Sequence, residues 1–208
     1  MRKWLMLLVV MCFAFVCNTM ANDSGDGFEI HTIDDALFAR IKGKSFKTNG
    51  TTKRDDLRYL TLLYINESGT TQHGEMICNK AIAKDLIEIF RELYRQHYPI
   101  HSIRLVDEYN ADDETSMEAN NTSCFNYRGT SSGAKLSKHA QGMAIDINPL
   151  WNPCIHLSGR NAGKIEPKTA KRTHKIDRND LCYRLFIKHG FRWGGSWRSL
   201  KDYQHFER

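Results

Sequence analysis

One long segment with helical hydrophobic spacing limits the folds that this chain can adopt. Between Asn79 and His97, apolar side chains recur at intervals of three and four residues along one helix face, at Ile82, Leu86, Ile89, Phe90, Leu93 and Tyr94. Asn79 is a suitable N-cap residue, and Pro99 cannot continue a helix. We therefore predict one amphipathic helix over residues 79–97.

The segments around this helix carry shorter patterns that follow no regular alternation. Residues 57–65 predict a largely buried strand, residues 66–74 a polar turn region, and residues 158–178 a solvated loop. Further short helices are expected after Asp34 or Asp35, within 112–120 and from Asn179 or Asp180 to Gly190, and further short strands at 103–109, 142–147, 191–193 and 203–207. This irregular succession favours a single α+β domain over a doubly wound parallel fold.

The N-terminal residues 1–21 have the layout of a secretory signal peptide. Arg2 and Lys3 form a positive start, residues 4–16 carry no charge, and small residues precede the cleavage site that we expect after Ala21. The apolar run is shorter than the ~20 residues that a permanent membrane helix needs. We therefore expect residues 22–208 to form an exported protein, periplasmic or cell-wall associated, without a stable transmembrane segment.

A lipoprotein anchor at Cys17 is the alternative for the N-terminus, but the bulky Phe15 and Val16 disfavour lipid attachment there. The mature chain has the size of one domain, and we expect a monomer. The formal net charge of the whole chain is +6, which would suit an anionic cell wall or nucleic acid. No nucleic-acid recognition motif accompanies this charge, so we expect no nucleic-acid partner.

The mature chain contains four cysteines, at Cys78, Cys124, Cys154 and Cys182. In an exported protein, four cysteines favour two disulfides in one of three pairings. Four buried free thiols are the alternative. Because no C-x-x-C pair is present, we do not expect a zinc site built on cysteine.

Two polar segments, residues 137–146 and 202–207, carry the side chains best suited to chemistry. His139 stands in a polar turn before the strand that contains Asp146, and His205 stands in the last predicted strand. Two imidazoles and one carboxylate suit zinc, with water in the open fourth position. His156 also follows the Asp146 strand closely and is the strongest competing ligand.

A hydrolytic site would need a base and a cation beside these ligands. Bound zinc lowers the pKa of its water to about 7, but a base must still accept the proton. Asp202 lies three residues before His205 and can reach the same site. Arg128 is the candidate cation that polarises a carbonyl or binds a substrate carboxylate.

Three motifs in the same order resemble those of a known family of zinc metallopeptidases. They are S-K-H-A-Q-G-M-A-I-D at 137–146, W-G-G-S-W followed by D-Y-Q-H-F-E at 193–207, and F-N-Y-R at 125–128. The first resembles the S-x-H-x-x-G-x-A-x-D signature of the VanY-like D-alanyl-D-alanine carboxypeptidases and their L-alanyl-D-glutamate endopeptidase relatives. The resemblance covers residues 125–208 and extends more loosely back to residue 79, which places the catalytic core at about 79–208.

The resemblance implies a role for each matching residue. His139, Asp146 and His205 would bind zinc, Asp202 would be the general base, and Arg128 would bind substrate or stabilise the oxyanion. Ser137 would support the first ligand, and Trp197 would line the cleft. Ser196 departs from the pattern, because relatives often carry Asp there. The implied fold is hedgehog/DD-peptidase-like, with a small antiparallel sheet that carries the zinc site between flanking helices.

The implied function is hydrolysis of the peptide stems of peptidoglycan, with zinc-bound water activated by Asp202. We expect a D-alanyl-D-alanine carboxypeptidase. One alternative is an L-alanyl-D-glutamate endopeptidase of the same mechanism, and another is a non-catalytic zinc-containing module that binds the cell wall. The presence of Asp202 favours an enzyme over the binding module.

Overall fold

The computed structural model describes residues 26–130 and 135–208 of the chain. The predicted signal peptide and Cys17 lie outside these residues. Among the described residues, no helix has the length and apolar character needed to cross a bilayer.

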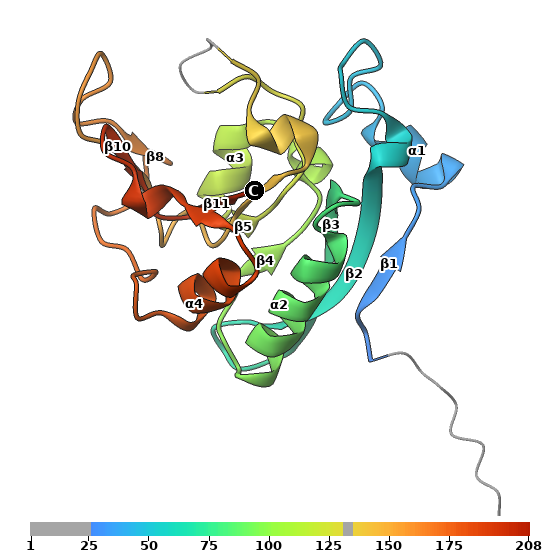
Figure 1. Cartoon of the computed structure of the whole chain (residues 1–208), viewed down its shortest axis with the longest axis horizontal. Helices are drawn as coiled ribbons and strands as arrows, with labels where there is room; N and C mark the ends of the chain where they lie inside the picture. The colour runs from blue at the N-terminus through green and yellow to red at the C-terminus, as the bar shows by residue number, and fades with distance from the viewer. Residues whose placement is uncertain (1–25, 131–134) are drawn as a thin grey trace, which may run out of the picture.

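An antiparallel sheet of three strands and one long helix form the N-terminal half of the molecule (Figure 1). Strand β2 (Leu57–Ile65) pairs with β3 (Thr71–Asn79) along its whole length, and β1 (Glu29–His31) pairs with the other edge of β2. Helix α2 (Ala83–Arg95) packs its apolar stripe against this sheet. The stripe is buried except at Tyr94, which is partly buried, so burial of apolar area holds helix and sheet together.

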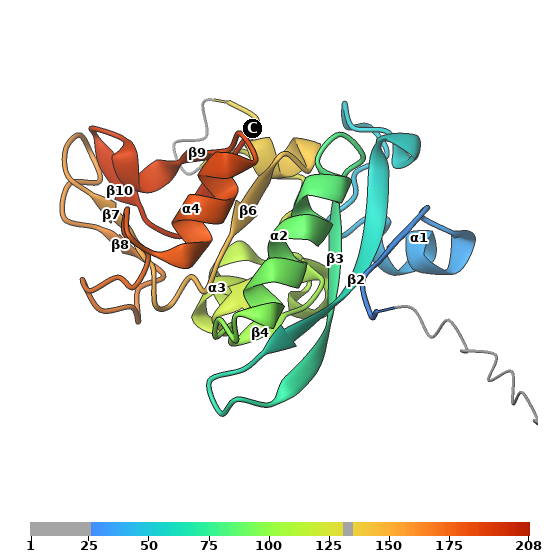
Figure 2. The same ribbon diagram turned by 60° about the horizontal axis from the view of Figure 1, so that its bottom comes forward.

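Two smaller antiparallel sheets form the C-terminal half. One has the strand order β6 (Ala144–Asp146), β11 (His205–Glu207) and β9 (Arg192–Trp193). The other has the order β10 (Leu200–Asp202), β7 (Cys154–His156) and β8 (Ile165–Glu166). β7, β8 and β10 gather at one end of the molecule (Figure 2).

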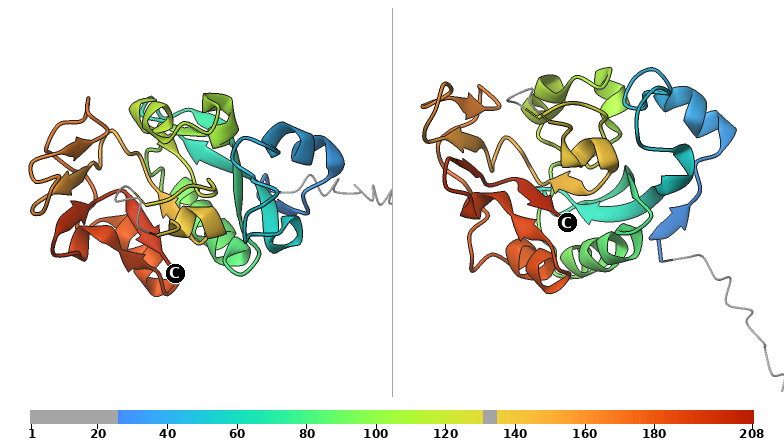
Figure 3. Two further views of the ribbon diagram at one scale, coloured as in Figure 1. Left: turned by 90° about the horizontal axis from the view of Figure 1, so that it is seen from above. Right: turned by 45° about the horizontal axis from the view of Figure 1, so that its top comes forward.

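Helix α4 (Leu181–Lys188) joins the two halves, because it lies beside α2 (Figures 2 and 3). The ring of Phe186 stacks on Phe206 of β11 with centroids 4.3 Å apart. At the surface, Asp85 of α2 pairs with Arg208 at 2.8 Å and with His189 at 3.0 Å. The core beneath β11 is therefore continuous with the core beneath α2.

Short elements connect these parts of the fold. They are α1 (Asp35–Ile41), α3 (Asp113–Glu118), the parallel pair β4 (Ser102–Ile103) and β5 (Asn121–Thr122), and the 3₁₀ helices η1 (Arg54–Asp56), η2 (Val106–Tyr109), η3 (Lys138–Gln141) and η4 (Gly194–Ser196).

The single α+β domain is confirmed, and so is the strand at residues 57–65. Three predictions for these segments were wrong in part. The strand expected at 103–109 ends at Ile103, and Val106–Tyr109 form the 3₁₀ helix η2. The long helix begins at Ala83, and Asn79 is the last residue of β3, where its side chain accepts a hydrogen bond from the Ala81 amide at 3.0 Å. The polar turn ends before Thr71, because β3 is an edge strand whose first residues point polar side chains into solvent.

The expectation of two disulfides is wrong, because all four cysteines of the described part are buried free thiols. Two of these thiols, those of Cys124 and Cys154, lie beside polar groups. The Sγ of Cys124 donates to the carbonyl of Gly142 at 3.5 Å, and Cys154 faces acidic side chains on β7's two neighbouring strands. Burial raises the pKa of the Cys154 thiol, and the nearby charges of Asp202 and Glu166 raise it further.

Candidate metal centre

The structure brings His139, Asp146 and His205 together in one buried cluster. The Nε2 of His139 lies 3.1 Å from Oδ2 of Asp146, and the Nδ1 of His205 lies 3.0 Å from Oδ1. The two imidazole nitrogens are 3.2 Å apart. Ligand atoms around a tetrahedral zinc ion lie roughly 3.3–3.5 Å apart. A small outward shift of the three side chains would therefore admit a divalent cation, and the donor set fits one.

The turn before β6 sets the position of His139. The hydroxyl of Ser137 accepts a hydrogen bond from the His139 amide at 3.2 Å and caps η3. Gly142 ends η3 with φ +66, in the left-handed region, and a Cβ there would lie 2.6 Å from the Asn79 amide nitrogen. Ser137 and Gly142 thus bound one capped turn, and this turn holds His139 just before strand β6.

The pairing of β6 with β11 sets the other two side chains. Asp146 is directly opposite His205, so both side chains lie on the same face of the sheet. Their neighbours Ile145 and Phe206 are also paired and face the core on the opposite side. A shift of the register by one residue would therefore exchange the cluster with the core.

Outer partners fix which nitrogen of each imidazole faces the cluster. The Nδ1 of His139 donates to the carbonyl of Cys124 at 2.6 Å, because a carbonyl can only accept. The Nε2 of His205 lies 3.4 Å from Oε2 of Glu207, and Arg192 contacts the other carboxylate oxygen, Oε1, at 2.9 Å. Such outer contacts orient metal-binding histidines. They leave Nε2 of His139 and Nδ1 of His205 to face Asp146.

The charges in the cluster favour a cation. Burial would raise the pKa of Asp146, but His139 and His205 hold it far below its ordinary value. Burial would likewise lower the pKa of His205, but its contacts with Asp146 and Glu207 raise it to about 10. The acidic groups thus attract a positive charge strongly at this position, and a divalent cation can supply it in place of protons.

Asp202 stands at the end of β10, beside this cluster. The residue is partly exposed, yet its Oδ1 is buried and has no hydrogen-bond partner among the described residues. Burial raises the pKa of Asp202 to about 7, although the charges of His205 and Arg128 oppose the shift. Gly194 permits this placement, because a Cβ there would lie 2.8 Å from the Cβ of Asp202. A buried carboxylate oxygen without a partner suits a proton acceptor.

Arg128 and Trp197 also border the cluster. The Nε of Arg128 lies 2.9 Å from Oδ1 of Asp113, at the start of α3. Burial raises the pKa of Asp113, and the charges of Arg128 and His139 oppose this. The ring of Trp197 is 5.1 Å from that of His205. Asp113 was not predicted, since its only signal in the sequence is an acidic residue in the first turn of a short helix.

A second group of potential ligands lies on β7 and β8. His156, the competing ligand, does not join the first cluster and instead lies 3.1 Å from Glu166 and 4.0 Å from the thiol of Cys154. The structure therefore contradicts one expectation, because the segment 158–178 is more than a solvated loop and supplies Glu166 of β8. Cys154 lies in a group that could hold a metal ion, which does not by itself decide the expectation of no zinc site built on cysteine.

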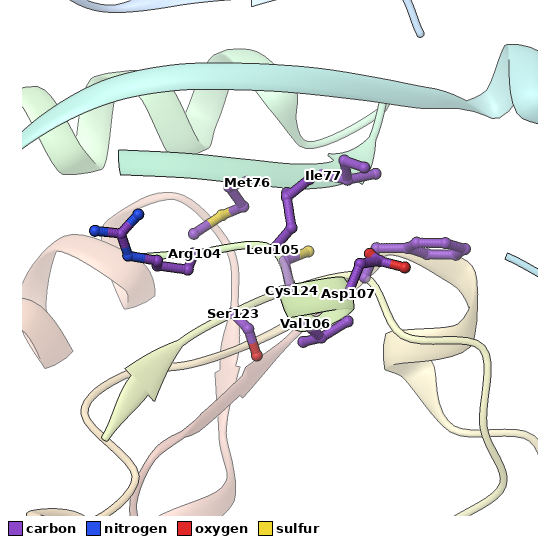
Figure 4. Close-up of a pocket in the computed structure, with 9 residues that line it drawn as sticks. Met76, Ile77, Arg104, Leu105, Val106, Asp107, Ser123 and Cys124 are labelled. Carbon is purple, nitrogen blue, oxygen red and sulfur yellow. The ribbon is translucent and has the colours of Figure 1, made fainter. Parts of the chain in front are cut away.

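The structure has two hollows that contain none of the potential ligands. A cavity of about 10 Å³ lies behind Cys124 and is bordered by Met76 and Leu105 (Figure 4). It can hold about one water molecule and no peptide. A larger surface hollow of about 490 Å³ is bordered by α1 and Tyr59. Neither includes a residue of the His139 cluster.

Residues 130–208 match the family model described as D-alanyl-D-alanine carboxypeptidase. The match confirms the resemblance to the VanY-like family and supports a peptidase. It includes His139, Asp146, Asp202 and His205, whereas Arg128 lies just before it. The chain matches none of the curated proteins and none of the solved structures that were searched.

Proposed function

We propose that the protein is a zinc-dependent peptidase that hydrolyses the peptide stems of peptidoglycan outside the cytoplasmic membrane. A D-alanyl-D-alanine carboxypeptidase is the first candidate. One observation carries the proposal: three potential ligands with atoms 3.0–3.2 Å apart lie beside the buried, unpartnered carboxylate oxygen of Asp202. A cation held by the three ligands would therefore lie next to a base.

His139, Asp146 and His205 would hold the cation through Nε2, the carboxylate and Nδ1. When bound, zinc would supply a Lewis acid that acidifies water and polarises the scissile carbonyl. The two histidines and Asp146 suit zinc because imidazole and carboxylate are among its usual ligands. Glu207 and the Cys124 carbonyl would keep both rings in the binding orientation.

Asp202 would accept the proton of the attacking water through Oδ1. It would then deliver that proton to the amine that leaves. A raised pKa suits both steps, because the group must bind the proton and release it again near neutral pH. The pairing of β10 with β7 holds the backbone of Asp202 directly opposite Cys154.

Arg128 would bind the substrate beside the scissile bond. The Nε of Arg128 lies 2.9 Å from Oδ1 of Asp113, so the terminal nitrogens of the guanidinium group would bind a carbonyl oxygen or a terminal carboxylate. Trp197 would form an apolar wall next to His205, and Ser137 would hold the turn that carries His139. An endopeptidase that cuts between L-Ala and D-Glu would use the same residues without binding a free carboxylate.

Mass spectrometry of defined muropeptides, incubated with the mature protein, tests the proposal. We expect loss of one terminal alanine, abolished by a chelator and restored by zinc. A chelator-sensitive cut between L-Ala and D-Glu would retain the mechanism and change the specificity. If folded, zinc-loaded protein cleaves no muropeptide, the enzyme proposal is wrong for this substrate class, and a wall-binding module takes its place.

A further inference from the structure

We propose that Cys154, His156 and Glu166 form a second metal site, separate from the first cluster, that binds a zinc-like divalent cation. The three residues come from the hairpin-like pair β7 and β8, which lies at one end of the molecule (Figure 2). None of them belongs to the motifs that carry the peptidase resemblance. The inference concerns metal binding alone and does not depend on hydrolysis.

The strand register places the three ligands on one face. Cys154 and His156 are two residues apart on β7, so their side chains point to the same side. Glu166 of β8 is directly opposite Cys154, which places its carboxylate on that side as well. The three ligand atoms lie within 4.8 Å of one another.

The distances are close to those of a tetrahedral site. The Nε2 of His156 is 3.1 Å from Oε2 of Glu166 and 4.0 Å from Sγ of Cys154. Around zinc, nitrogen–oxygen and nitrogen–sulfur ligand pairs lie roughly 3.4 and 3.6 Å apart. The two pairs that involve His156 therefore lie within about half an ångström of tetrahedral spacing. The third pair, between Sγ of Cys154 and the Glu166 carboxylate, lies within 4.8 Å and would close further around an ion.

The burial and the charges of these three residues both favour a bound divalent cation. Cys154 is 5% exposed and His156 is 6% exposed, and the side chain of Glu166 is 12% exposed. A thiolate and a carboxylate would neutralise a divalent cation in these surroundings. The combination of sulfur and imidazole selects zinc and other thiophilic metals over magnesium or calcium. The thiol proton would pass to solvent when the metal binds.

Lys164 and Asp202 border the second metal site. The ammonium group of Lys164 contacts Oε1 of Glu166 and leaves Oε2 directed at His156. Asp202 of β10 is directly opposite Cys154 on the other edge of β7. A cation in the second site would therefore lie one strand away from the residue proposed as the general base, and the fourth position can be taken by water.

Metal content and cobalt spectroscopy test this site. The mature protein would be stripped with a chelator under a phosphine reductant and reloaded with zinc, and the bound metal would be measured by mass spectrometry. We expect Cys154→Ser and Glu166→Gln each to lose one equivalent of zinc relative to wild type. Cys78→Ser, which removes another buried thiol, on β3, should retain the wild-type metal content.

Cobalt(II) distinguishes the two sites, because only the second contains a thiolate. We expect a thiolate-to-cobalt charge-transfer band in wild type, retained in His205→Ala and absent in Cys154→Ser. Circular dichroism would verify the fold of each variant, and Glu166→Gln serves if Cys154→Ser does not fold. Unchanged zinc content in both variants, or no such band in wild type, would overturn the second site. Loss of metal only in His205→Ala would leave the peptidase proposal standing without it.

Discussion

The two groups of potential metal ligands differ in how far along the chain their members lie. His139 and His205 are 66 residues apart and meet only because β6 pairs with β11. Cys154, His156 and Glu166 are separated by steps of 2 and 10 residues and need only the pairing of β7 with β8. The first site therefore depends on the completed tertiary fold, whereas the second depends on local structure.

The partners of the two groups differ as well. In the first, each imidazole has an acceptor outside the cluster, and the unpartnered oxygen of Asp202 lies beside it. In the second, Lys164 already neutralises part of the charge on Glu166. The first group thus has the outer contacts and the neighbouring carboxylate that the proposed catalysis would use, whereas the second has only what binding a cation would need.

The largest effect is expected from Asp202→Asn, which removes the base and keeps the shape of the side chain. General acid–base groups contribute typically about 10²–10⁴-fold, so hydrolysis should fall by this factor. Zinc content should stay at the wild-type level, because Asp202 is not a proposed ligand. Kinetics with a muropeptide and metal analysis of the same sample check this. Unchanged hydrolysis would remove Asp202 from the mechanism.

A smaller loss is expected from Asp113→Asn, which weakens the pair that orients Arg128. We expect kcat/KM to fall by about 10–100-fold, as for other contacts that orient an active-site group. Asp112→Asn is the matched control, because Asp112 caps the same helix through the Thr115 amide and does not contact Arg128. Equal losses in both variants would attribute the effect to the helix instead.

A further comparison between the two sites comes from Glu207→Gln. This change weakens the contact that orients His205, and we expect about tenfold weaker zinc binding at the first site. Competition with a chromophoric chelator in a Cys154→Ser background measures that site alone. The cobalt charge-transfer band of Cys154 should not change in the single Glu207→Gln variant. A change in this band would mean that the two sites are coupled.

The last prediction is a gradual dependence of the rate on pH. In the proposed mechanism hydrolysis requires the ionised carboxylate of Asp202, so the rate should fall about tenfold per unit as the pH drops below its pKa. Burial raises that pKa to about 7 from 3.8, and a bound cation would move it part of the way back. The acid limb of the kcat/KM profile should therefore lie between these values. A limb that persists unchanged in Asp202→Asn would belong to another group.

The first cluster was predicted mainly because its motifs resemble those of a known family. The sequence also placed His139 in a polar turn and Asp146 in an alternating strand, and the structure has both elements. Strand β2 was equally visible, since it is buried and rich in apolar side chains. In each case the signal lies within a few consecutive residues.

Other features could not be predicted, because they arise from contacts between distant residues. The first half of β3 is polar and exposed, so it resembles a turn until its pairing with β2 is known. Asp113 acquires its role only through Arg128. Glu166 lies in an aperiodic segment, and only the register of β8 against β7 brings it to His156 and Cys154. The absence of C-x-x-C therefore gave no sign of a cysteine in a candidate metal group.

The most direct test of the metal centre is a crystal structure of the zinc-loaded protein with diffraction data collected on both sides of the zinc absorption edge. We predict an anomalous difference peak within bonding distance of Nε2 of His139, Nδ1 of His205 and the carboxylate of Asp146. A protein that retains zinc in solution and shows no such peak at these three atoms would contradict the account.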